Sequence, residues 1–191
     1  MKNIVQFGLA NVHLAKLTEA NGAITYGTPF AVPGAVKLSV SKEGATVIFR
    51  ADNKDYYKKA INSGYKGNLE IADVPENVLT QIFGQAVDNN GAILENSEDV
   101  IARFALMCEI DGDANKRRIV FYDCLAERPS LEYETTDKED VKVKTATMDL
   151  TISPRSTDNN VKNIIEPTTE NQAVYDTFFT QVYEKNATAS V

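Results

Sequence analysis

The residue types that carry most enzyme chemistry are sparse in this chain. It holds a single histidine, His13, and two cysteines, Cys108 and Cys124. A Ser–His or Cys–His catalytic pair would have to use His13, and no serine lies in the Gly-x-Ser-x-Gly pattern of a nucleophile elbow. The three residues also lack the tight spacing of structural zinc ligands. We therefore expect no catalytic centre and no bound metal.

A turn with acidic residues comes nearest to a cation-binding motif. Asp111, Asp113 and Asn115 mimic the start of a calcium loop. The pattern fails at Lys116, where an EF-hand needs Gly, and at Tyr122, where it needs a bidentate Glu. The chain also has neither a Gly-x-x-x-x-Gly-Lys phosphate loop nor a Gly-x-Gly-x-x-Gly motif. We predict that the protein is not an enzyme and takes no cofactor.

Composition bounds the class of protein. The chain has 191 residues, of which 43% are hydrophobic and 25% charged, and its formal net charge is -7. This is typical of one globular domain, which we place at residues 1–191, and a negative balance disfavours a protein that grips phosphate backbones. No apolar run approaches the roughly 20 residues of a membrane span. Gln6 interrupts the N-terminal apolar stretch too early for a secretory signal, so we expect synthesis in a cytoplasm.

Alternating polar and apolar residues predict mostly strands. The pattern covers residues 36–41, 67–72 and 101–110, with shorter runs at 46–51 and 56–61. A long late strand has two contrasting faces, one with Ala146, Met148, Leu150 and Ile152 and the other with Thr145, Thr147, Asp149 and Thr151. Such period-2 patterns favour a mainly β (α+β) fold, an antiparallel β-sandwich or partly open barrel.

Two helices are predicted beside the sheet, at residues 75–84 and about 171–184. Asp73 is the expected N-cap of the first helix, and Gly84 can close it. The second begins after a capping-box pattern and carries an aromatic stripe that includes Tyr175 and Phe179. We favour packing of this stripe within the chain over docking on another subunit, since it would otherwise expose a large apolar surface.

The two cysteines lie on a predicted hairpin formed by residues 101–110 and 116–126. A hairpin centred near residue 113 pairs Cys108 with about Arg118, and Cys124 with about Ala102. The cysteines are then on the order of 20 Å apart at strand rise, too far for a disulfide. We expect two free core thiols.

Several segments, in one serial order, resemble the major tail protein family of long, non-contractile-tailed bacteriophages (siphophages). They are residues 7–16, 33–40, 51–57, 64–71, 128–131 and 175–184. The resemblance implies the phage tail-tube type of fold and a virion structural protein. Such proteins self-assemble into hexameric rings that stack into a tail tube, the conduit for DNA ejection into the host. The chain stops soon after its last predicted helix, so we expect no added immunoglobulin-like domain.

The resemblance also implies partners and a location. The main partner is the protein itself, with the tape measure protein and the tail terminator or distal tail proteins at other contacts. Double-stranded DNA would pass through the tube without specific binding, and no membrane insertion is implied. The protein would be made in the bacterial host cytoplasm and end in the virion tail. Two alternatives stay open: a tube-forming protein of a bacterial contractile secretion system, and a single-ring tail terminator or connector.

Two sets of candidate contact residues follow from the resemblance. An extended loop at residues 41–65 is expected to bridge subunits or rings through Asp52, Tyr56, Tyr57 and Tyr65, although an ordinary hairpin with surface tyrosines is also possible. The lumen of the tube is expected to be polar and not cationic, and hydroxyl-rich strand faces suit it. The lumen-facing candidates are Lys37, Ser39, Thr145, Thr147, Asp149 and Thr151, with Ser41 beside them. Lys37 needs an acidic neighbour to offset its charge.

Overall fold

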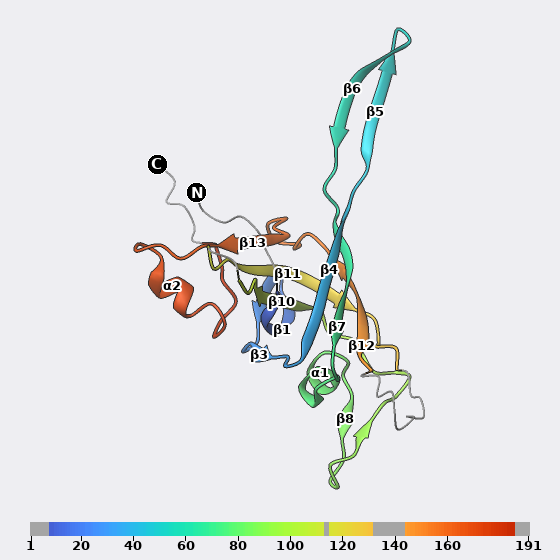
Figure 1. Ribbon diagram of the computed structural model, residues 1–191. Coiled ribbons are helices and arrows are strands. Elements are labelled where there is room, and N and C mark those ends of the chain that lie inside the picture. Colours follow the sequence, from blue (N-terminus) through green and yellow to red (C-terminus); the bar gives the residue numbers. More distant parts are fainter. Residues whose placement is uncertain (1–7, 113–114, 132–143, 186–191) are drawn as a thin grey trace, which may run out of the picture.

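The computed structural model describes residues 8–112, 115–131 and 144–185 (Figure 1). Two residues named above lie outside these ranges: Asp113 of the calcium-like turn, and Phe7 of the segment 7–16 that resembles the tail protein family. The strands are β1 (Ala10–Ala20), β2 (Ala23–Tyr26), β3 (Phe30–Ala31), β4 (Ala35–Glu43), β5 (Thr46–Ala51), β6 (Lys54–Ala60), β7 (Gly64–Ile71), β8 (Ala86–Val87), β9 (Ile93–Leu94), β10 (Phe104–Glu109), β11 (Arg118–Ala126), β12 (Ala146–Ile152) and β13 (Lys162–Ile165). The helices are α1 (Glu76–Gln81) and α2 (Gln172–Asp176).

One antiparallel sheet organises the molecule. Its strand order is β2-β1-β10-β11-β12-β7-β4, with β13 paired to β11 and β3 paired to β1. Two small hairpins, β5–β6 and β8–β9, form sheets of their own. The prediction of a mainly β, antiparallel fold with one or two flanking helices is confirmed, and the described strands do not close into a barrel.

The centre of the sheet is covered on both faces. One apolar cluster contains Phe104, Leu106 and Cys108 of β10. Residues of helix α1 and of the two strands β7 and β12 complete this cluster. Ala105 and Met107 point the other way into a second cluster, which the C-terminal segment covers. The sequence predicted only the first face as buried. The second face is buried because a segment distant in sequence packs on it.

The cysteine hairpin forms with a different register from the predicted one. Cys108 pairs with Ile119, and Cys124 pairs with Phe104 in place of Ala102. Cys108 is displaced by one residue because the two strands already pair in a different register next to the turn. A register shift between Phe104 and Leu106 adds a second residue of displacement at Cys124, because an extra residue in one strand displaces every later pair. Both cysteines are free and buried, as expected.

The first helix is shorter than predicted. It begins at Glu76, with Pro75 and not Asp73 in the N-cap position, and the Asp73 carboxylate accepts from the adjacent Val74 N–H. It ends at Gln81, after which Gly84 adopts a φ of 73°. That positive φ lets the chain turn away without the strain that a side chain would meet.

The C-terminal helix predicted at 171–184 is wrong in extent, since α2 covers only Gln172–Asp176. Continuing the helix would need the Tyr175 carbonyl as an acceptor. That carbonyl instead accepts a hydrogen bond from the Arg118 guanidinium on β11. It also accepts one from the Phe178 N–H, three residues later, in place of the four-residue spacing of an α-helix. The Thr177 hydroxyl also donates to the Ala173 carbonyl and competes with the helical pattern.

A long β-ribbon projects from the sheet (Figure 1). The β4–β7 ladder continues through backbone hydrogen bonds at residues 43–45 and 61–63 into the β5–β6 hairpin, here called the arm (residues 44–63). At the junction, a Cβ on Gly44 would lie 1.9 Å from the Ile61 carbonyl oxygen, so only glycine fits. Asp52 and Asn53 form the tip with φ values of 50° and 56°, typical of a type I′ hairpin turn.

Candidate assembly surfaces

A continuous polar face crosses strands β4, β7 and β12. The ladders place three rows of residues side by side: Lys37, Glu70 and Thr147; Ser39, Asn68 and Asp149; and Ser41, Lys66 and Thr151. On β12 the intervening residues, from Ala146 to Ile152, are buried in the core. We call these three rows, with the adjoining Thr145, the polar face. It is the side of the sheet that points away from the core.

The structure thus brings together all the candidates for the lumen. Lys37, Ser39, Thr147, Asp149 and Thr151 share one face, and Thr145 adjoins it through a hydrogen bond of 2.7 Å from its hydroxyl to Glu70. Sequence reasoning missed the residues of β7 that complete the face. The alternation of polar and apolar residues at 67–72 signalled them, but only the strand order shows that β7 lies between β4 and β12.

Charges on the polar face are balanced. Lys37 has Glu70 as its register partner, so the acidic neighbour that it needs is present. The Lys66 ammonium forms an ion pair of 3.1 Å with Glu43 at the end of β4. Asp149 adds one more carboxylate. The face therefore offers hydroxyl and amide groups, and each of its two lysines, Lys37 and Lys66, has an acidic residue beside it.

The second candidate surface is the arm. Side chains from Asp52 to Ser63 are all exposed, and several large apolar ones among the arm residues have no core to enter. They are Val47, Ile48, Phe49, Tyr56, Tyr57 and Ile61. Tyr56 is 74% exposed and Phe49 59%, although their rings touch edge to face. Exposed apolar groups on an isolated hairpin are typical of a surface that another molecule covers.

The candidates for subunit contacts separate into two places. Asp52, Tyr56 and Tyr57 lie on the arm, but Tyr65 does not. Tyr65 sits on β7 at the sheet, half-buried, where its ring packs against Phe121 at a centroid distance of 6.0 Å. The Lys162 ammonium lies over the same ring, 4.9 Å from its centroid. Tyr65 is therefore a packing residue at the root of the ribbon.

His13 has a structural place. Its ring stacks on Phe179 at a centroid distance of 4.7 Å, and Nδ1 lies 2.9 Å from the Asn11 carbonyl. The two thiols are far from ionised at neutral pH, since burial raises the pKa of Cys108 to about 12 and raises that of Cys124 further. Among the described residues there is no cluster of three or more His, Cys, Asp or Glu arranged for a metal.

Two arginines attach the C-terminal segment to the sheet. The guanidinium of Arg118 lies 3.8 Å from the ring centroid of Tyr175. Arg155, itself buried, bonds Glu184 at 2.6 Å and Asp158 at 2.9 Å. The hydrogen bonds from Arg155 lower the pKa of Asp158 to about 2. Burial raises the pKa of Tyr26, which lies beside Arg155, to about 12.

No helix in the described part of the chain has the length and apolar character to cross a bilayer. No family model matches the chain, and no curated protein matches it either. Among solved structures, the chain is similar to one in the 6-fold symmetrised cryo-EM structure of the anti-feeding prophage (AFP) baseplate. The match covers 82% of this chain and 93% of that one, at 12% identity and a TM-score of 0.39. A TM-score this low assigns neither fold nor function.

Proposed function

We propose that the protein is a virion structural protein that self-assembles into stacked hexameric rings, the tail tube of a long non-contractile-tailed phage. The observation that carries this proposal is the arm, a projecting hairpin whose large apolar side chains have no partner surface within the described chain. Burying such side chains stabilises an assembly by roughly 25 cal/mol per Å² of apolar surface. A protein that stays monomeric has no use for such a surface.

The polar face supports the same proposal. It includes β4, the terminal strand of the sheet, which pairs only with β7 among the described strands. An open edge strand is a template for another strand, so neighbouring subunits could extend the sheet into a continuous ring. The polar face would then line the channel. Its hydroxyls and paired charges release no counterions from DNA, so a duplex can slide past.

The remaining parts of the proposal follow from this role. The protein does no chemistry, and its partners are copies of itself, the tape measure protein and the proteins that cap the tube. It is made in the host cytoplasm and resides in the virion tail. Double-stranded DNA is a passenger in the channel and not a ligand.

Negative-stain microscopy of the purified protein tests the proposal. Tubes of uniform diameter, built of stacked rings with six-fold symmetry, are the expected result, with assembly increasing with protein concentration. Single rings that never stack would point to a terminator or connector instead. A monomer at every concentration would overturn the proposal.

A further inference from the structure

We propose that the end of the molecule opposite the arm is the docking surface for the arm of a second copy. This end, here called the acidic end, comprises residues 73–102 with α1 and the β8–β9 hairpin. The inference rests on the proposed function, because it names the contact that would join one ring to the next. It specifies which two surfaces are in contact and which complementary groups hold them together.

The acidic end has charges of one sign. Residues 73–102 contain no Lys or Arg, and their acidic residues are Asp73, Glu76, Asp88, Glu95, Glu98 and Asp99. Arg128 reaches over from the loop after β11, but its charge is engaged by Glu95, with an ion pair of 3.1 Å. The Glu98 carboxylate has no hydrogen bond or ion pair to any described residue.

Apolar side chains lie among these carboxylates. Val87, Ile93, Leu94 and Val100 are exposed, and Val100 is 81% exposed. Between α1 and the β8–β9 hairpin is a hollow, lined in part by Val74, Leu79 and Ile93. An apolar floor with a carboxylate rim suits a ligand that is both apolar and cationic.

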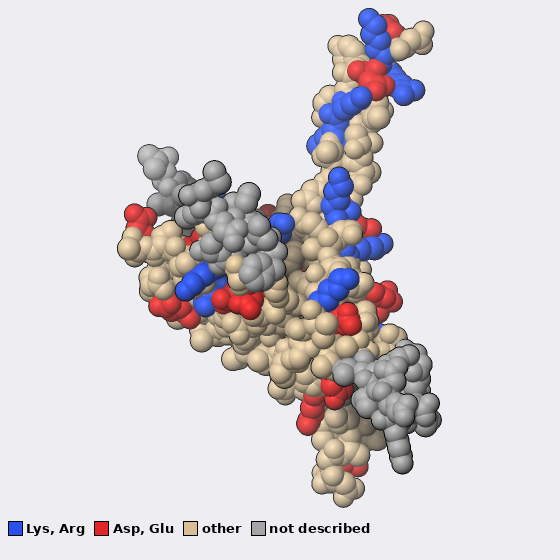
Figure 2. All heavy atoms as spheres, in the orientation of Figure 1, with Lys and Arg blue, Asp and Glu red and all other residues tan. Residues whose placement is uncertain are grey.

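The arm has that complementary composition. It carries Arg50, Lys54, Lys58 and Lys59 against Asp52 and Asp55. Asp55 is engaged within the arm by Arg50 and Lys58, each at 2.8 Å. Lys54 and Lys59 form no ion pair with any described residue, so their charges are available to a partner. Lys and Arg atoms follow the arm along its length (Figure 2).

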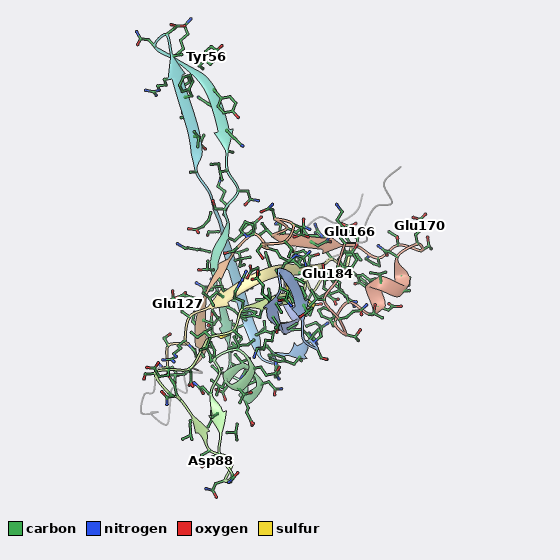
Figure 3. The ribbon with its side chains drawn as sticks, turned by 180° about the vertical axis from the view of Figure 1, so that it is seen from behind. Tyr56, Asp88, Glu127, Glu166, Glu170 and Glu184 are labelled. Carbon is green, nitrogen blue, oxygen red and sulfur yellow. The ribbon has the colours of Figure 1, made fainter. Side chains whose placement is uncertain are left out.

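The two surfaces face opposite ways. The arm and the β8–β9 hairpin lie at opposite ends of the molecule (Figure 1), with Tyr56 near one extreme and Asp88 at the other (Figure 3). The arm extends about 25–30 Å from Gly44 to its tip at strand rise. A contact between two different surfaces of identical copies does not close on itself as a dimer would, and repeats along an axis. That geometry fits the stacking of one ring on the next.

Charge reversal on each surface tests the match. The arm variant carries Lys54→Glu and Lys59→Glu, and the end variant carries Glu98→Lys. Each alone should raise the critical concentration for stacking about tenfold or more, because like charges then meet and 1.4 kcal/mol corresponds to a factor of ten. Lys16→Glu, on the exposed side of β1, is the control and should change nothing.

Sedimentation velocity and microscopy distinguish the outcomes. Mixed in equal amounts, the arm variant and the end variant should associate, because the unchanged arm of the end variant can dock on the unchanged acidic end of the arm variant. Tubes from either single variant at the wild-type concentration would overturn the docking surface and leave the proposed tube function standing. A wild-type chain that is monomeric at every concentration would overturn both proposals.

Discussion

Lys37 on β4 and Glu70 on β7 are direct register partners, and Glu70 also accepts a hydrogen bond from the Thr145 hydroxyl. A carboxylate therefore lies beside Lys37 on the same face of the sheet, and β4 pairs only with β7 among the described strands. A polar face with offset charge attracts a polyanion less than one with a free cation. The relationship joins residues that are far apart in the sequence, and only the strand order creates it.

If the polar face lines the channel, adding positive charge there should hold DNA. We expect Thr147→Lys with Asp149→Lys to slow or stall DNA release from otherwise intact particles, with an effect that weakens as salt is raised. Release is measured by dye fluorescence after triggering. Ala173→Lys with Asp176→Lys adds the same charge on the exposed side of α2 and should leave release unchanged. Normal release from fully assembled polar-face variants would place that face outside the channel.

Removing the tip of the arm should separate folding from assembly. Replacing residues 49–57 with Asn-Gly joins the register partners Ile48 and Lys58 by a two-residue turn. The two core clusters include no residue from 44 to 63, so the midpoint of thermal unfolding should shift by less than about 3 °C. Tubes should be absent in negative stain. Normal tubes from this variant would refute a role for the arm in assembly.

The two thiols should be protected in the folded protein. Burial raises the pKa of Cys108 and of Cys124, and only the thiolate reacts with a disulfide reagent. At pH 8 we expect both to react at least about 100-fold more slowly in native protein than in denaturant, as measured by absorbance of the released thiol. Cys108→Ala should remove one of the two groups that react in denaturant. Rapid labelling of the native chain would contradict the burial of the hairpin.

Acid should destabilise the fold through the loop that contains Arg155 and Asp158. The pKa of Asp158 falls from 3.8 to about 2 on folding because of its hydrogen bonds with Arg155. Its ionised form stabilises the folded state above pH 4, and this contribution is lost as the pH falls from about 4 to 2. Since the carboxylate is 36% exposed, we expect a loss of about 1 kcal/mol in the free energy of unfolding.

Urea unfolding of wild type and Asp158→Asn at pH 6 and pH 3 measures that loss. The variant lacks the titrating carboxylate, so its stability should fall less between the two pH values. Asp176→Asn is the matched control, because Asp176 lies on exposed α2 away from Arg155. If the free energy of unfolding changes equally with pH in wild type and Asp158→Asn, Asp158 is not the group responsible for the loss.

Much of the fold was predictable because it depends on local patterns. Residues 145–152 alternate, and the strand they form has its apolar residues in the core and Thr147, Asp149 and Thr151 on the other side. The hairpin turn at Asp52 and Asn53 also lies in a segment whose short strands the sequence indicated. The residues of a single strand are enough to show which of its faces is apolar and which is polar.

Where predictions failed, a distant contact had overridden a local preference. The apolar stripe at 171–184 indicates a helix, but Arg118 takes the Tyr175 carbonyl that a longer helix would use. Tyr65 belongs by sequence to the loop with Tyr56 and Tyr57, but Phe121 holds it at the sheet. The register of the cysteine hairpin differs from the predicted one by one residue next to the turn and by a second residue after the irregularity between Phe104 and Leu106, and no residue pattern indicates either.

Local residue patterns are enough to indicate a mainly β chain without motifs for chemistry, and to show which residues on each strand are polar. Tertiary structure decided which strands lie side by side, and so gathered Lys37, Glu70 and Thr147 into one row of a polar face. It also placed the cationic arm and the acidic end at opposite extremes of the molecule (Figure 1). The reason is physical: side-chain alternation fixes the two faces of a strand, but strand order and register depend on contacts between residues far apart in the chain.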